Sequence, residues 1–173
     1  MGSDNEIVLI VDDHNQIIDA RPRAIMRRLN LTHRASYILV FDRHDRLFIH
    51  KRTQSKDVFP GYHDIAAGGV VKQGETYRQS AERELFEELG IRGVPLTELF
   101  EIFYSDDSSR VWGQVYRCRY DGEMTLQKEE IESGRFMPVA DILAKAKSLR
   151  ITPDSLQVLQ RYVEMQKGSA ASY

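Results

Sequence analysis

The stretch GVVKQGETYRQSAERELFEELGI, residues 69–91, decides what fold and what site this chain is expected to have. Its second part predicts a helix over residues 76–89. Thr76 is a residue type that caps helix N-termini, the interior is rich in the helix formers Glu, Arg, Ala and Leu, and Gly90 follows the last turn. A glycine at that point is typical of a left-handed helix end.

Three glutamates of this helix are expected on one broad face, because Glu84, Glu87 and Glu88 are spaced by three and four residues. The opposite side is expected to lie in the core through residues at four-residue spacing: Ala81, Leu85 and Leu89. Clustered carboxylates repel one another, and a hard divalent cation with a preference for oxygen ligands removes that repulsion. The pattern therefore favours a metal site that also takes substrate phosphates. A solvated acidic helix face is the alternative, and it is the commoner outcome for glutamate-rich helices in general.

The complete pattern argues against a plain acidic face. Its seven fixed positions are Gly69, Glu75, Arg83, Glu84, Glu87, Glu88 and Gly90, with apolar residues after the Arg-Glu pair and after the last glycine. A chance match in a chain of this length is on the order of 10⁻⁷ at average residue frequencies. This segment resembles the Nudix box, with every defining position intact.

The resemblance implies roles for these residues. Glu84, Glu87 and Glu88 are the expected metal ligands and catalytic carboxylates for Mg²⁺ (or Mn²⁺), and the carbonyl of Gly69 is a further ligand. Glu75 and Arg83 are expected to support them, with Arg83 pairing with Glu87 one turn on.

The Nudix family often takes one more carboxylate from a loop after the later strands. Residues 129–132 are the candidate segment, and we favour Glu130, with a solvated loop glutamate as an equally weighted alternative. Lys51, Arg52 and Lys56 precede the box and are expected to neutralise substrate phosphates. A surface role is the alternative for any one of the three basic residues.

Three segments before the box resemble isopentenyl-diphosphate isomerase and the isomerase-like Nudix hydrolases of bacteria: residues 31–35, 51–56 and 59–61. The isomerase is therefore the enzymatic alternative. Its reaction needs a cysteine just before the box glycine, where this chain has Gly68, and a histidine ligand where this chain has Val70. Hydrolysis of a diphosphate is expected instead, since it needs only metal, water and a base.

The remaining histidines and the cysteine are expected to be structural. His33 matches an isomerase ligand position but stands alone, and His63 is expected at the surface of a loop. The single cysteine, Cys118, falls in a predicted strand and is expected to be a small core residue.

The order of predicted elements indicates an α+β fold with α/β/α layers, in which a mixed β-sheet is packed between helices. Strands are predicted at residues 7–11, 16–20, 35–41, 47–51, 96–103 and 110–120, and helices at 24–29, 76–89, 139–147 and 153–166. The resemblance places a Nudix domain at 32–167, with an N-terminal β-hairpin extension at 1–31 and a flexible tail at 168–173.

Bulk properties exclude several partner classes. The chain has 173 residues and a formal net charge of −2, whereas a generic nucleic-acid binder is usually basic. One cysteine allows no internal disulfide, residues 1–6 do not resemble a signal peptide, and no apolar stretch is long enough for a bilayer, so a cytoplasmic protein without membrane or nucleic-acid partners is expected. The oligomeric state, including a homodimer, is left open.

The expected function is therefore metal-dependent hydrolysis of a diphosphate linkage in a nucleoside diphosphate derivative or a related small molecule, in a bacterial enzyme. Besides the isomerase, a Nudix domain that binds a nucleotide without catalysis is an alternative.

Overall fold

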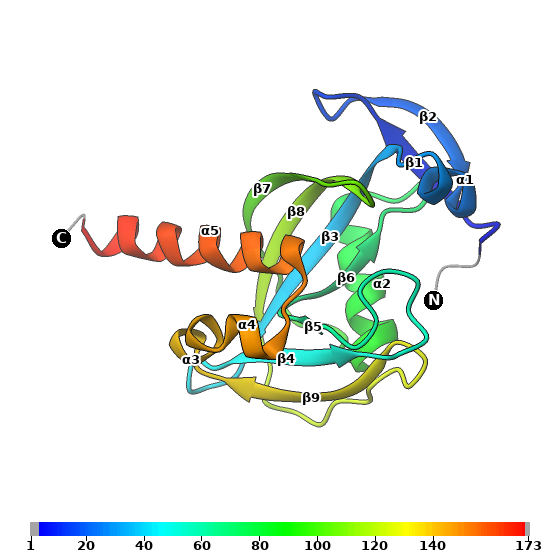
Figure 1. The fold of residues 1–173 in the computed structure, drawn as a ribbon. Coiled ribbons are helices and arrows are strands. Elements are labelled where there is room, and N and C mark those ends of the chain that lie inside the picture. The colour runs from blue at the N-terminus through cyan, green and yellow to red at the C-terminus, as the bar shows by residue number, and fades with distance from the viewer. Residues whose placement is uncertain (1–3, 172–173) are drawn as a thin grey trace.

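The computed structural model describes residues 4–171. The strands are β1 (Ile7–Val11), β2 (Ile17–Pro22), β3 (Thr32–Phe41), β4 (Leu47–Arg52), β5 (His63–Asp64), β6 (Ala67–Val70), β7 (Thr97–Ser105), β8 (Arg110–Arg119) and β9 (Ile131–Met137). The helices are α1 (Arg23–Arg28), α2 (Tyr77–Leu89), α3 (Val139–Ala144), α4 (Ala146–Leu149) and α5 (Pro153–Ala170). Figure 1 shows that helices lie on both sides of the sheet.

Strand β3 organises the sheet. It runs parallel to β8 over all ten of its residues, from the pair Thr32 and Arg110 to the pair Phe41 and Arg119. Along its other edge it pairs antiparallel with β1, β6 and β4 in turn. Strand β7 pairs with β8, while β5 and β9 pair with β4. The predicted mixed sheet is thus confirmed.

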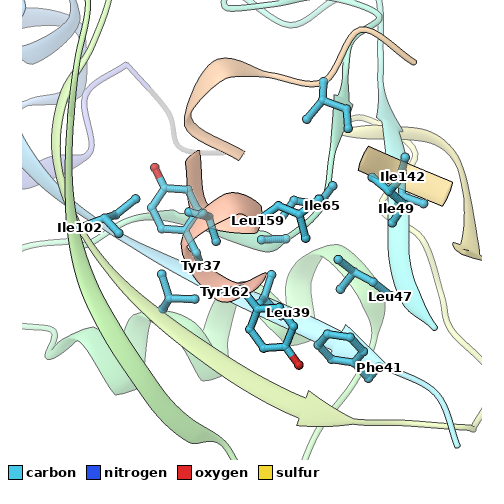
Figure 2. Close-up of a cluster of buried hydrophobic side chains, with 14 of the residues drawn as sticks. Tyr37, Leu39, Phe41, Leu47, Ile49, Ile65, Ile102, Ile142, Leu159 and Tyr162 are labelled. Atoms are coloured by element: carbon cyan, nitrogen blue, oxygen red, sulfur yellow. The ribbon is translucent and has the colours of Figure 1, made fainter. Parts of the chain in front are cut away.

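Side chains of β3 alternate between two cores, which is why both of its faces are apolar. Tyr37, Leu39 and Phe41 face the side covered by α5, whose buried residues include Leu159 and Tyr162. Figure 2 shows this cluster, with the rings of Phe41 and Tyr162 close together. On the other side, Ile38 and Val40 pack against the buried face of α2: Ala81, Leu85 and Leu89. The predicted α/β/α layering and the predicted buried face of the helix are confirmed.

Helix α2 begins and ends where its sequence predicts. The Thr76 hydroxyl accepts from the Gln79 backbone N–H, and the Gln79 side chain accepts from the Thr76 N–H, which forms a capping box. Gly90 ends the helix in the left-handed conformation with φ 71°. These contacts fix the start of the helix, and therefore which residues of α2 face β6.

The sequence-based prediction missed three strands and joined two helices. Strands β5 and β6 are short, and β9 has only two buried positions, so each depends on pairing with β3 or β4 more than on its own composition. The helix predicted at 139–147 is divided into α3 and α4 at Lys145. Helix α5 continues to Ala170 and includes three residues of the predicted tail, whereas residues 172–173 lie outside the described part of the chain.

The N-terminal segment forms the predicted hairpin. Strands β1 and β2 are antiparallel neighbours, and β1 joins the sheet through Ile10, which pairs with His33 of β3. Val8, Ile10 and Met26 form a small buried cluster with Val70 of β6. This cluster fixes α1 beside the strand that carries the box glycine. Within residues 4–171, no helix has the length and apolar character needed to cross a membrane.

Candidate active site

Carboxylates from α2 and from the turn before β9 meet in a cleft of about 400 Å³, part of it open to solvent. Glu84 and Glu88 line it from the helix, and Glu130 lines it from the turn. Gly68 and Gly69 of β6 form part of its wall. The structure thus brings together two of the three helix glutamates, the favoured loop glutamate and the box glycine.

The two glycines of β6 allow the helix carboxylates to approach the backbone. A Cβ atom on Gly69 would lie 2.5 Å from Oε1 of Glu84, so the space that a side chain would fill is taken by the carboxylate. The backbone N–H of Gly68 donates to Oε2 of Glu88 at 3.1 Å. Both carboxylates are therefore held against the strand, and their oxygens face the cleft that the Gly69 backbone lines.

Arg83 connects the remaining carboxylates of the box. It donates to both oxygens of Glu75, at 2.6 and 3.0 Å, and to Glu84 at 2.7 Å. It also donates to Glu87 at 3.1 Å, which confirms the predicted pairing one turn on. One guanidinium thus positions three of the carboxylates and offsets part of their mutual repulsion.

Burial and mutual repulsion act on the two cleft glutamates. Burial raises the pKa of Glu88 well above its ordinary value, and the negative charge of Glu84 raises it further. The pKa of Glu84 is also raised, first by burial and then by Glu87, against the opposing effect of Arg83. Without a cation this pair therefore retains protons more readily than isolated glutamates do.

Two of the predicted metal-binding and substrate-binding residues, Glu87 and Lys51, line neither this cleft nor its neighbour. The Glu87 side chain is 36% exposed and does not line the cleft. Lys51 pairs with Glu132 at 3.0 Å and lines neither this cleft nor its neighbour. Among residues 4–171, no three His, Cys, Asp or Glu side chains are already arranged around one metal position.

Glu130 is held by Lys56. The ammonium of Lys56 contacts Oε2 of Glu130 in an ion pair that is mostly buried. Burial alone would raise the pKa of Glu130, but the hydrogen bond and charge of Lys56 outweigh it, and the pKa is lowered. Glu130 is therefore ionised at neutral pH, and Lys56 connects the carboxylate cleft to the larger cleft beside it.

The adjoining cleft encloses about 930 Å³, part of it open to solvent, and shares Gly68, Gly69 and Glu88 with the first. Two aspartates from distant segments, Asp64 and Asp154, lie in its lining. Arg52 donates to Asp64 at 2.7 Å, and the hydroxyl of Tyr37 donates to Asp154 at 3.0 Å. Burial and the charge of Asp64 raise the pKa of Asp154. This larger cleft therefore has a polar, hydrogen-bonding lining.

His33 and His63 differ in their burial and in the part of the fold in which they lie. His33 is 3% exposed in the wall of the larger cleft, and burial lowers its pKa to about 3, so it is neutral. His63 was predicted at the surface, but it lies in β5, partly buried, with Nδ1 close to the carbonyl of Leu149. Cys118 is buried, free and in β8, as predicted.

The sequence analysis predicted Arg52 and Lys56 of the larger cleft but missed several other residues that line it. Asp64, Asp154 and Tyr37 belong to no recognisable motif, and the fold alone brings them together. It also missed Arg23 and Arg27 of α1, which line the same cleft. Their four-residue spacing, which places both on one helix face, was the available signal.

Comparisons with known proteins give matches over most of the chain. The family model described as NUDIX domain matches residues 31–162. The uncharacterized Nudix hydrolase PA4841 of Pseudomonas aeruginosa is 42% identical over 94% of this chain and 96% of its own length. The uncharacterized Nudix hydrolase YfcD of Escherichia coli is 38% identical over 92% of this chain and 87% of its own.

Solved structures show the same fold at lower identity. DR0079 from Deinococcus radiodurans has a TM-score of 0.76 at 21% identity, covering 90% of this chain and 98% of that one. The NUDIX domain of NrtR from Shewanella oneidensis, in complex with ADP ribose, has a TM-score of 0.64 at 18% identity. That alignment covers 78% of this chain and 88% of the NrtR domain. The resemblance to isomerase-like proteins is not confirmed by these relatives.

Proposed function

The chain belongs to the NUDIX domain family, as a Nudix hydrolase, and from this premise we propose that it cleaves the diphosphate linkage of a nucleoside diphosphate derivative or a related small molecule with the help of Mg²⁺ or Mn²⁺. The observation that carries the proposal is the meeting of Glu84, Glu88 and Glu130 in one cleft beside the box glycine. Diphosphate hydrolysis uses such a set of oxygen donors.

The residues of the cleft fit a hard divalent cation. Their donors are carboxylate oxygens, and the missing side chain at Gly69 leaves room for the Glu84 carboxylate against the strand. We assign Glu84, Glu87, Glu88 and the Gly69 carbonyl as the groups that hold it. Glu87 reaches the site by exchanging its contact with Arg83, which a half-exposed side chain can do. A bound cation of this kind polarises a phosphoryl oxygen and lowers the pKa of a bound water.

The chain's own side chains then supply the proton acceptor and the phosphate contacts. Glu130 is ionised and lines the cleft, so it can accept the proton of the attacking water. Lys56 exchanges Glu130 for a substrate phosphate, and Arg52 adds positive charge in the larger cleft. Lys51 faces Glu132 outside both clefts, so we no longer assign it to phosphate binding.

The isomerase alternative conflicts with the backbone at Gly68. This residue has φ 148°, and a Cβ there would lie 1.9 Å from the carbonyl oxygen of Ser36. A cysteine cannot occupy this position in this backbone, so one of the two groups needed to move a proton to and from carbon is missing. The non-catalytic alternative predicts binding of a nucleotide without turnover.

The proposed setting is the cytoplasm, because a chain with one cysteine forms no internal disulfide. A small-molecule diphosphate is the proposed partner.

The test is a hydrolysis screen with Mg²⁺ and, separately, Mn²⁺ over nucleoside diphosphate derivatives, ADP-ribose, nucleoside triphosphates, coenzyme A esters and isoprenoid diphosphates. We expect turnover of at least one class. Glu84→Gln, Glu87→Gln and Glu88→Gln should each lower its rate by about 10²-fold or more, because metal and electrostatic contributions of this kind supply several kcal/mol.

The matched control is Glu82→Gln, on the same helix but exposed and outside the cleft. It should leave the rate unchanged. No turnover on any diphosphate, together with nucleotide binding, would instead support the binding module. Conversion of isopentenyl diphosphate into dimethylallyl diphosphate at an enzymatic rate would overturn the proposal in favour of the isomerase.

A further inference from the structure

Helix α1 presents two arginines to the larger cleft. Arg23 and Arg27 are one turn apart on this helix and both line the cleft wall, together with Lys56 and Glu88. Arg23 also lines the carboxylate cleft. The helix precedes residue 31, where the match to the family model begins. Two basic side chains at the proposed site thus come from the N-terminal extension and not from the family domain.

The position of Arg27 lowers the stability of the free protein. Its Nε is buried and has no hydrogen-bond partner within residues 4–171. Burial lowers the pKa of Arg27, repulsion from Arg23 and Arg52 lowers it further, and only part of this is offset by attraction to Asp57. A buried donor without an acceptor, among like charges, is destabilising. An anion in the cleft that Arg27 lines would attract this guanidinium and offset the repulsion from Arg23 and Arg52.

Arg27 lines the larger of the two clefts, which includes their junction. In the proposed reaction the diphosphate sits at the junction of the two clefts, beside Gly69 and Glu88, which line both. In the free protein Arg52 is paired with Asp64 and Lys56 with Glu130, so each must give up a carboxylate before it donates to a phosphate. A guanidinium offers several donors in a planar fork that fits phosphate oxygens.

We propose, resting on the proposed function, that Arg27 is a substrate-binding residue that donates to a phosphate oxygen of the diphosphate, so that the N-terminal extension completes the substrate site. Arg23, which lines both clefts, adds positive charge for the same anion. Affinity for the diphosphate then depends on a helix outside the family domain.

The test compares Arg27→Gln with Arg28→Gln, its exposed neighbour in the same helix, which lines neither cleft. Binding of inorganic pyrophosphate is measured by calorimetry in buffer with EDTA, where no hydrolysis occurs. We expect Arg27→Gln to weaken binding about tenfold or more, as for a charged hydrogen bond, and Arg28→Gln to leave it unchanged. Arg27→Lys, which keeps the charge, should recover part of the affinity.

Thermal unfolding of the free proteins separates a binding role from a structural one. Since Arg27 lacks a partner for Nε, Arg27→Gln should leave the melting temperature unchanged or raise it. A lower melting temperature, with pyrophosphate affinity unchanged, would show that Arg27 only supports the fold and would overturn the inference. Absence of pyrophosphate binding by the natural protein would overturn it as well.

The hydrolysis screen distinguishes a failure of this inference from a failure of the proposed function. If a diphosphate is turned over with the same KM by the natural protein and by Arg27→Gln, the inference fails and the hydrolase stands. If no diphosphate is turned over but pyrophosphate binding depends on Arg27, the hydrolase proposal fails and the anion site stands.

Discussion

At the scale of single residues, two adjacent glycines do different things. Gly69 leaves space that the Glu84 carboxylate occupies, and that neighbour is the end of a flexible side chain. Gly68 faces the backbone of β3 and has φ 148°, a conformation that L-residues rarely adopt. Gly69 therefore makes room for a carboxylate of the site, whereas Gly68 allows β6 to pack closely against β3.

This difference predicts the effect of adding one methyl group. Gly68→Ala should lower the free energy of unfolding by about 3 kcal/mol or more, because backbone strain adds to a clash with the Ser36 carbonyl that cannot move away. Gly74→Ala is the control, with φ 84° but no atom within 4 Å of the added Cβ. It should cost only the strain, about 1 to 2 kcal/mol. Urea unfolding measures both, and equal losses would contradict the packing argument.

At the scale of elements, local determinants account for what the sequence could predict. Helix α2 was predicted almost to the residue, since its cap, its buried face and its final glycine all lie within the segment itself. Strands β5, β6 and β9 were missed, because they form by pairing with β3 and β4. The same distinction holds for the site: the box glutamates were visible in one segment, whereas Asp64 and Asp154 meet only in the fold.

The capping box of α2 carries the prediction at this scale. Thr76→Ala removes the side-chain acceptor for the Gln79 N–H and should lower the free energy of unfolding by about 1 kcal/mol. The turnover of folded enzyme should not change, because the carboxylates of the site lie in the last two turns of the helix. Chemical denaturation measures the change in stability, and initial rates at low temperature measure the turnover of the folded enzyme. A loss of rate without a loss of stability would show that the cap acts on the site directly.

At the scale of the whole molecule, the carboxylate cleft lies where β6, α2, the N-terminal segment and the turn before β9 meet. Strand β6 pairs with β3, α2 packs on β6, and the N-terminal hairpin with α1 covers the end of both strands. Figure 1 shows β1, β2 and α1 at the same end of β3. The buried carboxylates of Glu84 and Glu88 repel one another there, so the free protein is expected to carry a stability cost at its site.

The free energy of unfolding should therefore depend on pH, and the direction of this dependence follows from the raised pKa of Glu84 and Glu88. In the unfolded chain these groups lose their protons near about pH 4.3, whereas in the native state they hold them to higher pH. Stability from this pair is therefore full at low pH and is lost as the pH rises through the native pKa. His33 and His50, with pKa values lowered to about 3 and about 4, act in the opposite direction as the pH falls below about 6.5. A comparison of variants that share both histidines cancels their effect.

The last prediction combines pH with metal. A divalent cation binds the ionised carboxylates and displaces their protons, so its stabilising effect should grow with pH. Melting temperatures of the natural protein and of Glu88→Gln, with Mg²⁺ and with EDTA, should be measured over a series from about pH 5 to about pH 8, above the pKa of an unfolded glutamate. For the natural protein we expect Mg²⁺ at about ten times its dissociation constant to add on the order of 1 kcal/mol at the higher pH, and less at the lower pH. Glu88→Gln removes one of the negative charges that a bound cation neutralises. In EDTA this variant should therefore lose less stability than the natural protein as the pH rises, and Mg²⁺ should have little effect on its melting temperature. If both proteins respond equally to Mg²⁺, the cation binds elsewhere. If the stability of the natural protein in EDTA does not fall relative to that of Glu88→Gln as the pH rises, the two carboxylates do not repel one another as their burial implies.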